Sequence, residues 1–165
     1  MLFRSLRAFG FDRAAVLDGG WAKWTREGWP VSTEPCRYPP GRFVPNPRAG
    51  QFVDKGSVRA AIGDPSTCII NALSLEQHRG TGGVHYGRRG AIAGSVCVPA
   101  RSLTDPETHS YLPLERLRAA FEATGAFDRE RVITYCGGGI AASRDRKSTR
   151  LNSSHIQKSR MPSSA

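Results

Sequence analysis

Three short apolar segments, separated by helical and loop segments, constrain the fold of this chain most strongly. They are TCIINA (67–72), SVCV (95–98) and RVITY (131–135). Continuous apolar runs of this length are typical of strands that are buried on both sides in a parallel sheet. Between the last two segments, Pro113 begins an amphipathic helix that ends at Gly125. This alternation of strands and helices predicts an α/β fold with a mostly parallel sheet.

The first part of the chain predicts shorter elements and a linker. Apolar residues at helical spacing predict a helix that ends near Gly10, and residues 14–17 predict a strand that is followed by an Asp-Gly-Gly turn and a helix. Residues 31–50 hold five of the eleven prolines and lack periodicity, which predicts a linker or an extended arm. Further on, Asp54 can cap a short helix, and residues 76–79 can add one helical turn.

The charge pattern argues against a polyanion as partner. The net charge is +10, but half of it lies in the last 22 residues, which contain six cations and one acidic residue, Asp145. Because no base-stacking aromatic residues are interleaved with these cations, we expect no nucleic-acid partner. No segment approaches the roughly 18 apolar residues of a membrane span, and the first residues lack the pattern of a signal peptide. We therefore expect a cytoplasmic protein without a membrane partner, and the sequence does not indicate its oligomeric state.

The spacing of cysteines and histidines does not indicate a metal site. The cysteines contain no C-x-x-C pair, and the histidines contain no pair at positions i and i+4. Two disulfides are possible by number, but a cytosolic chain of this size does not need them. We expect no metal. The four cysteines are Cys36, Cys68, Cys97 and Cys136.

Cys136 has the setting of a nucleophile. It follows the apolar strand 131–135 and precedes three glycines and a helix-forming segment. At the carboxyl end of a parallel strand, glycines let the backbone curl so that N–H groups point inward, and the following helix adds its positive end. Such a cradle binds an anion and favours a thiolate. Cys136 could instead be a small buried residue, but three successive glycines have a large entropic cost in a merely structural turn.

The other cysteines lack this setting. Cys36 lies in the predicted linker, and Cys68 and Cys97 lie in strand-like segments, where packing is their expected role.

After Ser143 the sequence becomes polar and loses periodicity, so residues 145–165 predict a disordered tail. This tail resembles translated adapter or vector sequence, so we expect it to be foreign to the natural protein.

Two stretches of the chain resemble the rhodanese family, in particular its tandem-domain thiosulfate and 3-mercaptopyruvate sulfurtransferases. FGFDRAAVLDGGWAKWTREGWPVST (9–33) is similar to the end of the first, non-catalytic domain, and residues 52–143 are similar to most of the second, catalytic domain. The resemblance implies the end of a first rhodanese domain at 1–33, a linker at 34–51 and a truncated catalytic domain at 52–144. The expected fold is therefore a rhodanese-like parallel sheet flanked by helices.

The segment CGGGIAAS is similar to the six-residue active loop of the family. The resemblance implies that the Cys136 thiolate takes the outer sulfur of a small donor molecule as a persulfide, and that a thiophilic acceptor such as cyanide or a thiol then removes it. It implies no metal and no organic cofactor. The residues implied to form the anion and persulfide cradle are Gly137, Gly138, Gly139, Ile140 and Ala141.

Departures from the family pattern leave the sulfur donor open. The two positions after Cys136 are glycines, whereas thiosulfate-specific members often have basic residues there, and the loop also lacks the serine and threonine of mercaptopyruvate enzymes. The strand-end Asp-x-Arg of the family appears as Asn71-Ala72-Leu73, and Gly-His-Ile-Pro-Gly appears as Gly90-Ala91-Ile92-Ala93-Gly94. The arginine that binds the donor is expected among three residues, each of which could instead be a solvated surface charge: Arg79, Arg88 and Arg89.

Two other functional classes have to be weighed against a sulfurtransferase. A cysteine-dependent phosphatase or arsenate reductase needs an arginine six residues after the cysteine, and this chain has Ala142 there. A non-catalytic, rhodanese-like binding module is the remaining alternative, because of the substitutions at Asn71, Leu73 and Ala91. The sequence favours a sulfurtransferase over both.

Overall fold

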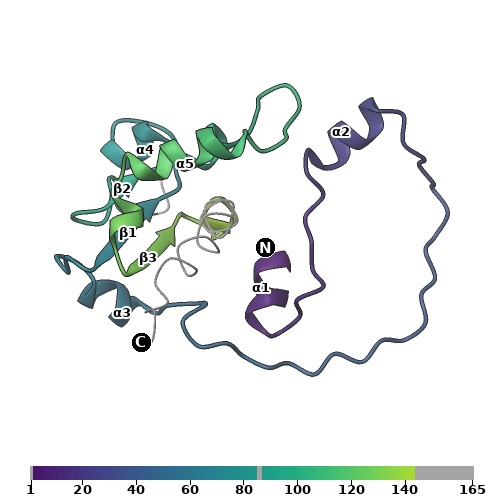
Figure 1. Cartoon of the computed structure of the whole chain (residues 1–165), viewed down its shortest axis with the longest axis horizontal. Coiled ribbons are helices and arrows are strands. Elements are labelled where there is room, and N and C mark those ends of the chain that lie inside the picture. Colours follow the sequence, from purple (N-terminus) through teal and green to yellow (C-terminus); the bar gives the residue numbers. More distant parts are fainter. Residues whose placement is uncertain (1, 85–86, 144–165) are drawn as a thin grey trace, which may run out of the picture. The chain divides into compact units, whose positions relative to one another are not determined.

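The computed structural model describes residues 2–84 and 87–143 of the chain (Figure 1). The tail predicted to be disordered, residues 145–165, lies outside this part. Within the described residues, no helix has both the length and the apolar character that crossing a bilayer requires.

The chain divides into two compact units, of which the first contains the residues up to Phe52 together with Asp105–Tyr111. The helices of this unit are α1 (Leu2–Ala8) and α2 (Gly20–Arg26), which confirms both predictions of helix. Figure 1 shows that the chain continues from α2 as a long extended segment without a helix or a strand. This irregular course was expected from the prolines of residues 31–50.

The prediction of a strand over residues 14–17 is wrong. These residues have no regular structure, and Val16 and Leu17 are 44% and 55% exposed. A strand is stable only when it pairs with neighbouring strands, and none of the described strands pairs with this segment. A short apolar run does not by itself show that a pairing partner exists.

Polar contacts join α2 and the turn before it to the segment 105–111 of the same unit. The Asp18 carboxylate accepts a hydrogen bond from the backbone N–H of Tyr111 at 3.0 Å, and Lys23 Nζ donates to Ser110 Oγ at 3.0 Å. The Arg26 guanidinium donates to the carbonyl oxygen of Glu107 at 2.6 Å. These contacts bring residues more than 80 positions apart into one unit.

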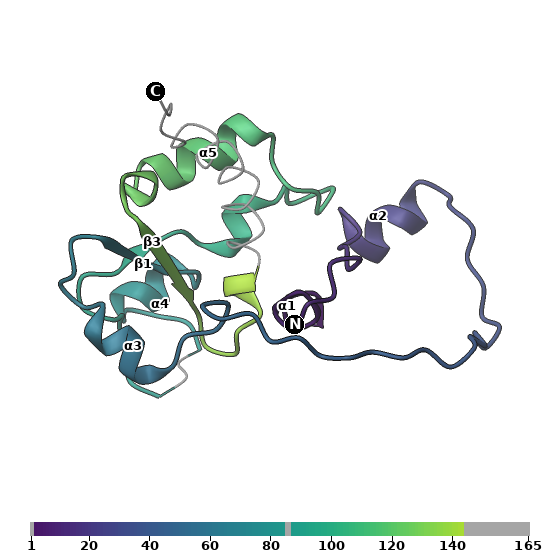
Figure 2. The same cartoon turned by 60° about the horizontal axis from the view of Figure 1, so that its bottom comes forward.

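The second unit contains Val53–Thr104 and the chain from Leu112 onward, and a parallel sheet lies at its centre (Figure 2). β1 (Thr67–Asn71) lies between β2 (Val96–Cys97) and β3 (Arg131–Tyr135). All three predicted strands and their parallel pairing are confirmed. β1 is buried along its whole length, as expected for a central strand that is covered on both sides.

The register of the sheet aligns the carboxyl ends of the strands. Asn71, the last residue of β1, pairs with Cys97 at the end of β2 and with Tyr135 at the end of β3. The residue after β3 is Cys136, so the predicted nucleophile lies at the edge where the three strands end. Ligands of open α/β sheets bind at this kind of edge.

Helices flank the sheet, and two of them begin at the residues that the sequence predicts. The side chain of Asp54 accepts a hydrogen bond from the backbone N–H of Ser57 at 2.7 Å and so caps the first helix of the unit. Pro113 precedes the longest helix, and Gly125 follows its end. The helices of the unit are α3 (Lys55–Ala60), α4 (Leu75–Arg79), α5 (Leu114–Glu122) and the 3-10 turns η1 (Ala100–Leu103) and η2 (Ala126–Asp128).

The core of the second unit lies between the sheet and these helices. Ile70 of β1, Leu103 of η1 and Phe121 of α5 are completely buried. A cluster of Ala61, Ile69 and Ile133 packs elsewhere in the unit, and Tyr135 is packed against it. Because the middle and the last residue of β3 are thus fixed by packing, the loop that begins at Cys136 starts from a rigid element.

Candidate active site

The loop after β3 turns back on the sulfur of Cys136. The backbone N–H of Gly139 donates a hydrogen bond to Cys136 Sγ at 3.0 Å. Gly139 adopts φ = 77°, a left-handed conformation that favours glycine over all other residues. A backbone donor at this distance stabilises negative charge on the sulfur.

Gly139 is held from both sides. Its carbonyl oxygen accepts a hydrogen bond from Ser143 Oγ at 2.7 Å, while its N–H points to the sulfur. Thr134 Oγ1 donates to the carbonyl oxygen of Ala142 at 3.3 Å, which joins the loop to β3. Residues 141–143 are helical, so the predicted order of strand, glycine loop and helical turn is present.

Cys136 packs against small side chains. Ala72, Ala100 and Ala142 form a buried cluster, and Cys136 and Ala141 are packed against it. Small residues let the loop approach the end of β1 closely. Ala142 stands where a cysteine-dependent phosphatase needs its arginine, and here this position is 4% exposed and belongs to the apolar cluster. The site therefore has no cation at that position to clamp a phosphoryl group.

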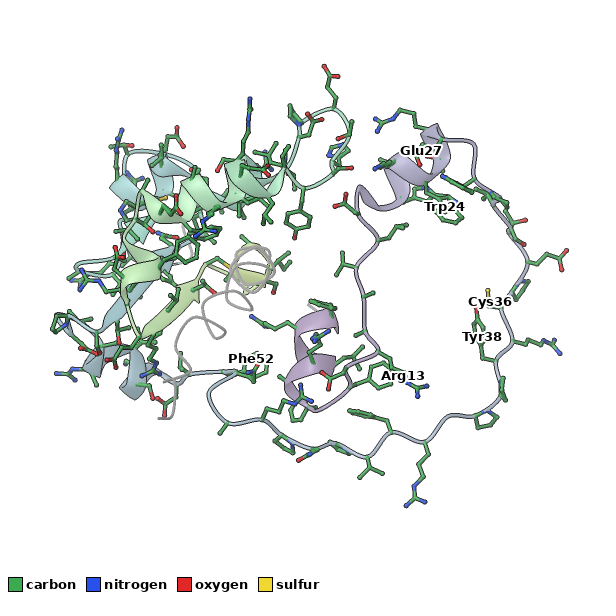
Figure 3. All side chains as sticks on the ribbon, viewed as in Figure 1. Arg13, Trp24, Glu27, Cys36, Tyr38 and Phe52 are labelled. Carbon is green, nitrogen blue, oxygen red and sulfur yellow. The ribbon has the colours of Figure 1, made fainter. Side chains whose placement is uncertain are left out.

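The other three cysteines have different surroundings. Burial raises the pKa of the Cys68 thiol, although the charge of Arg129 acts in the opposite direction, so Cys68 is held as a thiol. Cys97 Sγ donates to the carbonyl oxygen of Leu73 at 3.4 Å. Cys36 is exposed on the extended segment of the first unit (Figure 3).

A hydroxyl group next to the nucleophile fixes a neighbouring loop. The Tyr135 hydroxyl accepts a hydrogen bond from the backbone N–H of Ile92 at 2.9 Å and lies 3.0 Å from Ser95 Oγ. Ile92 belongs to the segment Gly90-Ala91-Ile92-Ala93-Gly94 that replaces a motif of the rhodanese family. The sequence analysis did not select Tyr135, although a tyrosine at the end of an apolar strand presents a hydroxyl that needs a partner.

Asn71 turns the chain after β1. Its side chain is completely buried, and Oδ1 accepts a hydrogen bond from the backbone N–H of Leu73 at 3.0 Å. Its Nδ2 lies 3.3 Å from Nδ1 of His78 in α4. The residue that replaces the family's strand-end aspartate therefore has a positioning role, which a neutral amide can fill.

Two cavities meet at Cys136 and Gly137. The smaller has a volume of about 360 Å³ and is lined by Arg88 and Arg89, two of the three arginines predicted to bind the donor. The larger has a volume of about 590 Å³. Arg79 is exposed at the end of α4 and lines neither of them. The structure thus brings two of the three predicted arginines to the nucleophile.

The larger cavity is lined by an arginine that the sequence analysis missed. Arg101 lies in η1, two residues after Pro99, at the carboxyl end of β2. Its position after a predicted strand was the available signal, because side chains at that edge of a parallel sheet lie near Cys136.

Among the described residues, no cluster of three or more possible metal ligands is present.

Comparison with known proteins finds relatives that are named sulfurtransferases. A "Probable 3-mercaptopyruvate sulfurtransferase" of Pseudomonas aeruginosa is 28% identical over 134 residues, which cover 79% of this chain and 46% of that protein. A thiosulfate sulfurtransferase of Bos taurus is 28% identical over 142 residues, which cover 82% of this chain and 46% of that protein. The structure of SseA from Escherichia coli, described under the rhodanese fold and 3-mercaptopyruvate sulfotransferases, matches with a TM-score of 0.74 and 24% identity over 91% of this chain and 56% of that chain.

The parallel sheet, its flanking helices and the match to SseA define the class: this is a protein of the rhodanese fold. No family model matches the chain. The sequence relatives named above are sulfurtransferases, and together with the fold they support the resemblance to the rhodanese family that the sequence indicated. The chain spans about half the length of the curated relatives it matches.

Proposed function

We propose that the second unit transfers sulfane sulfur from thiosulfate or 3-mercaptopyruvate to a thiophilic acceptor, with Cys136 as the catalytic residue that carries the sulfur as a persulfide. The observation that carries this proposal is the hydrogen bond from Gly139 N–H to Cys136 Sγ. Neither of the two cavities that Cys136 lines is lined by another cysteine.

In the first half-reaction, the Cys136 thiolate attacks the outer sulfur of the donor. With thiosulfate, the donor's S–S bond breaks and sulfite leaves with the electron pair. With 3-mercaptopyruvate, the C–S bond breaks, and the carbon keeps the electron pair and takes up a proton to give pyruvate. Arg88 and Arg89 line the cavity next to Cys136 and supply positive charge for the donor's sulfonate or carboxylate.

In the second half-reaction, the acceptor attacks the outer sulfur of the persulfide. Cyanide becomes thiocyanate, and the electron pair of the broken S–S bond returns to Cys136. The Gly139 N–H is directed at the sulfur that bears negative charge at the start and end of this cycle, so the same donor serves both half-reactions.

Thiocyanate formation from thiosulfate and cyanide tests the proposal. We expect turnover by the wild-type chain, loss of turnover in Cys136→Ser, and unchanged turnover in the matched variant Cys36→Ser, because Cys36 is exposed on the extended segment of the first unit. Turnover that survives in Cys136→Ser would contradict the assignment.

The donor site is tested separately. Replacing Arg88 and Arg89 together by alanine removes both cations of the smaller cavity, and we expect the KM for thiosulfate to rise at least about tenfold. Arg79→Ala serves as the matched control, since Arg79 lines neither cavity. Equal KM values in the double variant and the control would show that the donor binds elsewhere.

A non-catalytic binding module is the second candidate, because Leu73 stands at the arginine position of the family's Asp-x-Arg and places an uncharged side chain in both cavities. This alternative predicts a folded wild-type chain that forms no thiocyanate. Circular dichroism on the assayed sample distinguishes this result from unfolding.

A further inference from the structure

The two cavities that meet at Cys136 differ in size and chemistry. The smaller has two arginines, Arg88 and Arg89, in a volume of about 360 Å³. The larger, of about 590 Å³, has one arginine and an apolar wall. The apolar wall residues that line only the larger cavity are Ala72, Pro99, Ala100, Ile140 and Ala141, whereas the aliphatic residues that line only the smaller one are Ala91 and Ile92.

Because of these differences, each cavity suits a different kind of ligand. Two cations in a small space suit a compact, doubly charged anion such as thiosulfate. One cation beside an apolar wall suits a larger organic molecule that has a single negative charge and a hydrocarbon body. No ion pair within the described part of the chain involves Arg101, so its guanidinium is available to such a ligand.

We infer that the larger cavity is an acceptor site for thiols that carry a carboxylate on a short apolar body, and that Arg101 is the residue that selects them. The inference rests on the proposed function, because a thiol acceptor needs a persulfide on Cys136. Both ligands reach the same sulfur, since Cys136 and Gly137 line both cavities. The donor and the acceptor thus have separate cavities that adjoin at the sulfur.

The transfer step at this site is balanced. The acceptor thiolate attacks the outer sulfur of the Cys136 persulfide, a new S–S bond forms on the acceptor, and the protein S–S bond breaks with its electron pair returning to Cys136. A second thiol molecule then reacts with the acceptor persulfide in solution. This gives a disulfide and sulfide, and the released sulfide can be measured.

The experiment compares two thiol acceptors of similar size, 3-mercaptopropionate with its carboxylate and neutral 2-mercaptoethanol, with thiosulfate as donor. For Arg101→Ala we expect the KM for 3-mercaptopropionate to rise about fivefold, the upper end of the effect of one solvent-exposed charge pair. The KM for 2-mercaptoethanol and the cyanide-dependent rate should stay within about twofold. Arg101→Lys should recover part of the loss, and Arg116→Ala on α5, which lines neither cavity, should show none.

The outcomes separate the two proposals. If the wild-type chain forms thiocyanate and Arg101→Ala leaves the KM for 3-mercaptopropionate unchanged, the acceptor site is overturned while the sulfurtransferase stands. If all acceptors lose activity equally in Arg101→Ala, the residue has no selective role and the inference is also overturned. If the folded wild-type chain forms neither thiocyanate nor sulfide, the proposed function fails, and the acceptor site fails with it.

Discussion

Replacing Gly139 by alanine perturbs the site at one backbone position. Gly139 adopts φ = 77°, and an alanine in this region costs about 1–2 kcal/mol. Its N–H donates to Cys136 Sγ, and its carbonyl oxygen accepts from Ser143 Oγ. The variant can keep the conformation and store the strain, or relax and move the N–H away from the sulfur.

Gly138→Ala is the matched control. Gly138 lacks a positive φ, and a methyl group added there meets no atom within 4 Å. Both substitutions restrict the unfolded chain by a similar amount, a stabilising effect of about 0.4–1 kcal/mol. This contribution cancels when the two variants are compared. The difference between their free energies of unfolding therefore measures the strain at Gly139 directly, and we expect about 1–2 kcal/mol.

Urea unfolding followed by circular dichroism provides the free energies, and thiocyanate formation provides the rates. We expect Gly139→Ala to be the less stable variant and, if the loop relaxes, to lose about tenfold in kcat/KM, which corresponds to about 1.4 kcal/mol of lost stabilisation of the charged sulfur. If the loop relaxes, the stabilities of the two variants should lie closer together, and Gly139→Ala should lose activity. Equal stability of the two variants combined with equal activity would refute both the left-handed conformation and the role of the Gly139 N–H.

Two further predictions concern stability. Tyr135→Phe removes the hydroxyl that accepts from the backbone N–H of Ile92, so we expect a loss of about 1–2 kcal/mol in the free energy of unfolding, and an unchanged value would contradict this contact. Hydrogen bonds from Thr67 and Ser66 lower the pKa of Asp64 in the folded chain. The ionised carboxylate therefore stabilises the folded chain at pH values above the unfolded-state pKa of about 4. This stabilisation is lost as the pH falls below that value and through the lower pKa of the folded chain. The stability difference between wild type and Asp64→Ala should accordingly shrink between about pH 6 and pH 3 in urea titrations, whereas a constant difference would speak against this linkage.

The sheet and its nucleophile were predictable because their signals are local. Residues 67–72 and 131–135 are continuous apolar runs, and a buried parallel strand requires this pattern. Asp54 and Pro113 mark helix starts through their own side chains. Cys136 was recognisable because three successive glycines have a large entropic cost, which a merely structural turn would not explain.

Features that depend on distant residues were not predictable. Residues 14–17 are apolar enough for a strand, but no partner strand is present in the described part of the chain. The contact between Asp18 and Tyr111 spans 93 positions, and no local sequence pattern predicts it. Arg101 follows a predicted strand, but the sequence does not show which strand ends meet, and the alignment of strand ends brings Arg101 to the cavity beside Cys136.

The central claim is that Cys136, and none of the other cysteines, carries sulfur. Peptide mapping by mass spectrometry after treatment with thiosulfate or 3-mercaptopyruvate, followed by alkylation, tests it most directly. We predict an addition of about 32 Da on the peptide that contains Cys136 and none on the peptides that contain Cys36, Cys68 or Cys97. An addition on Cys68 or Cys97 with none on Cys136 would contradict the account.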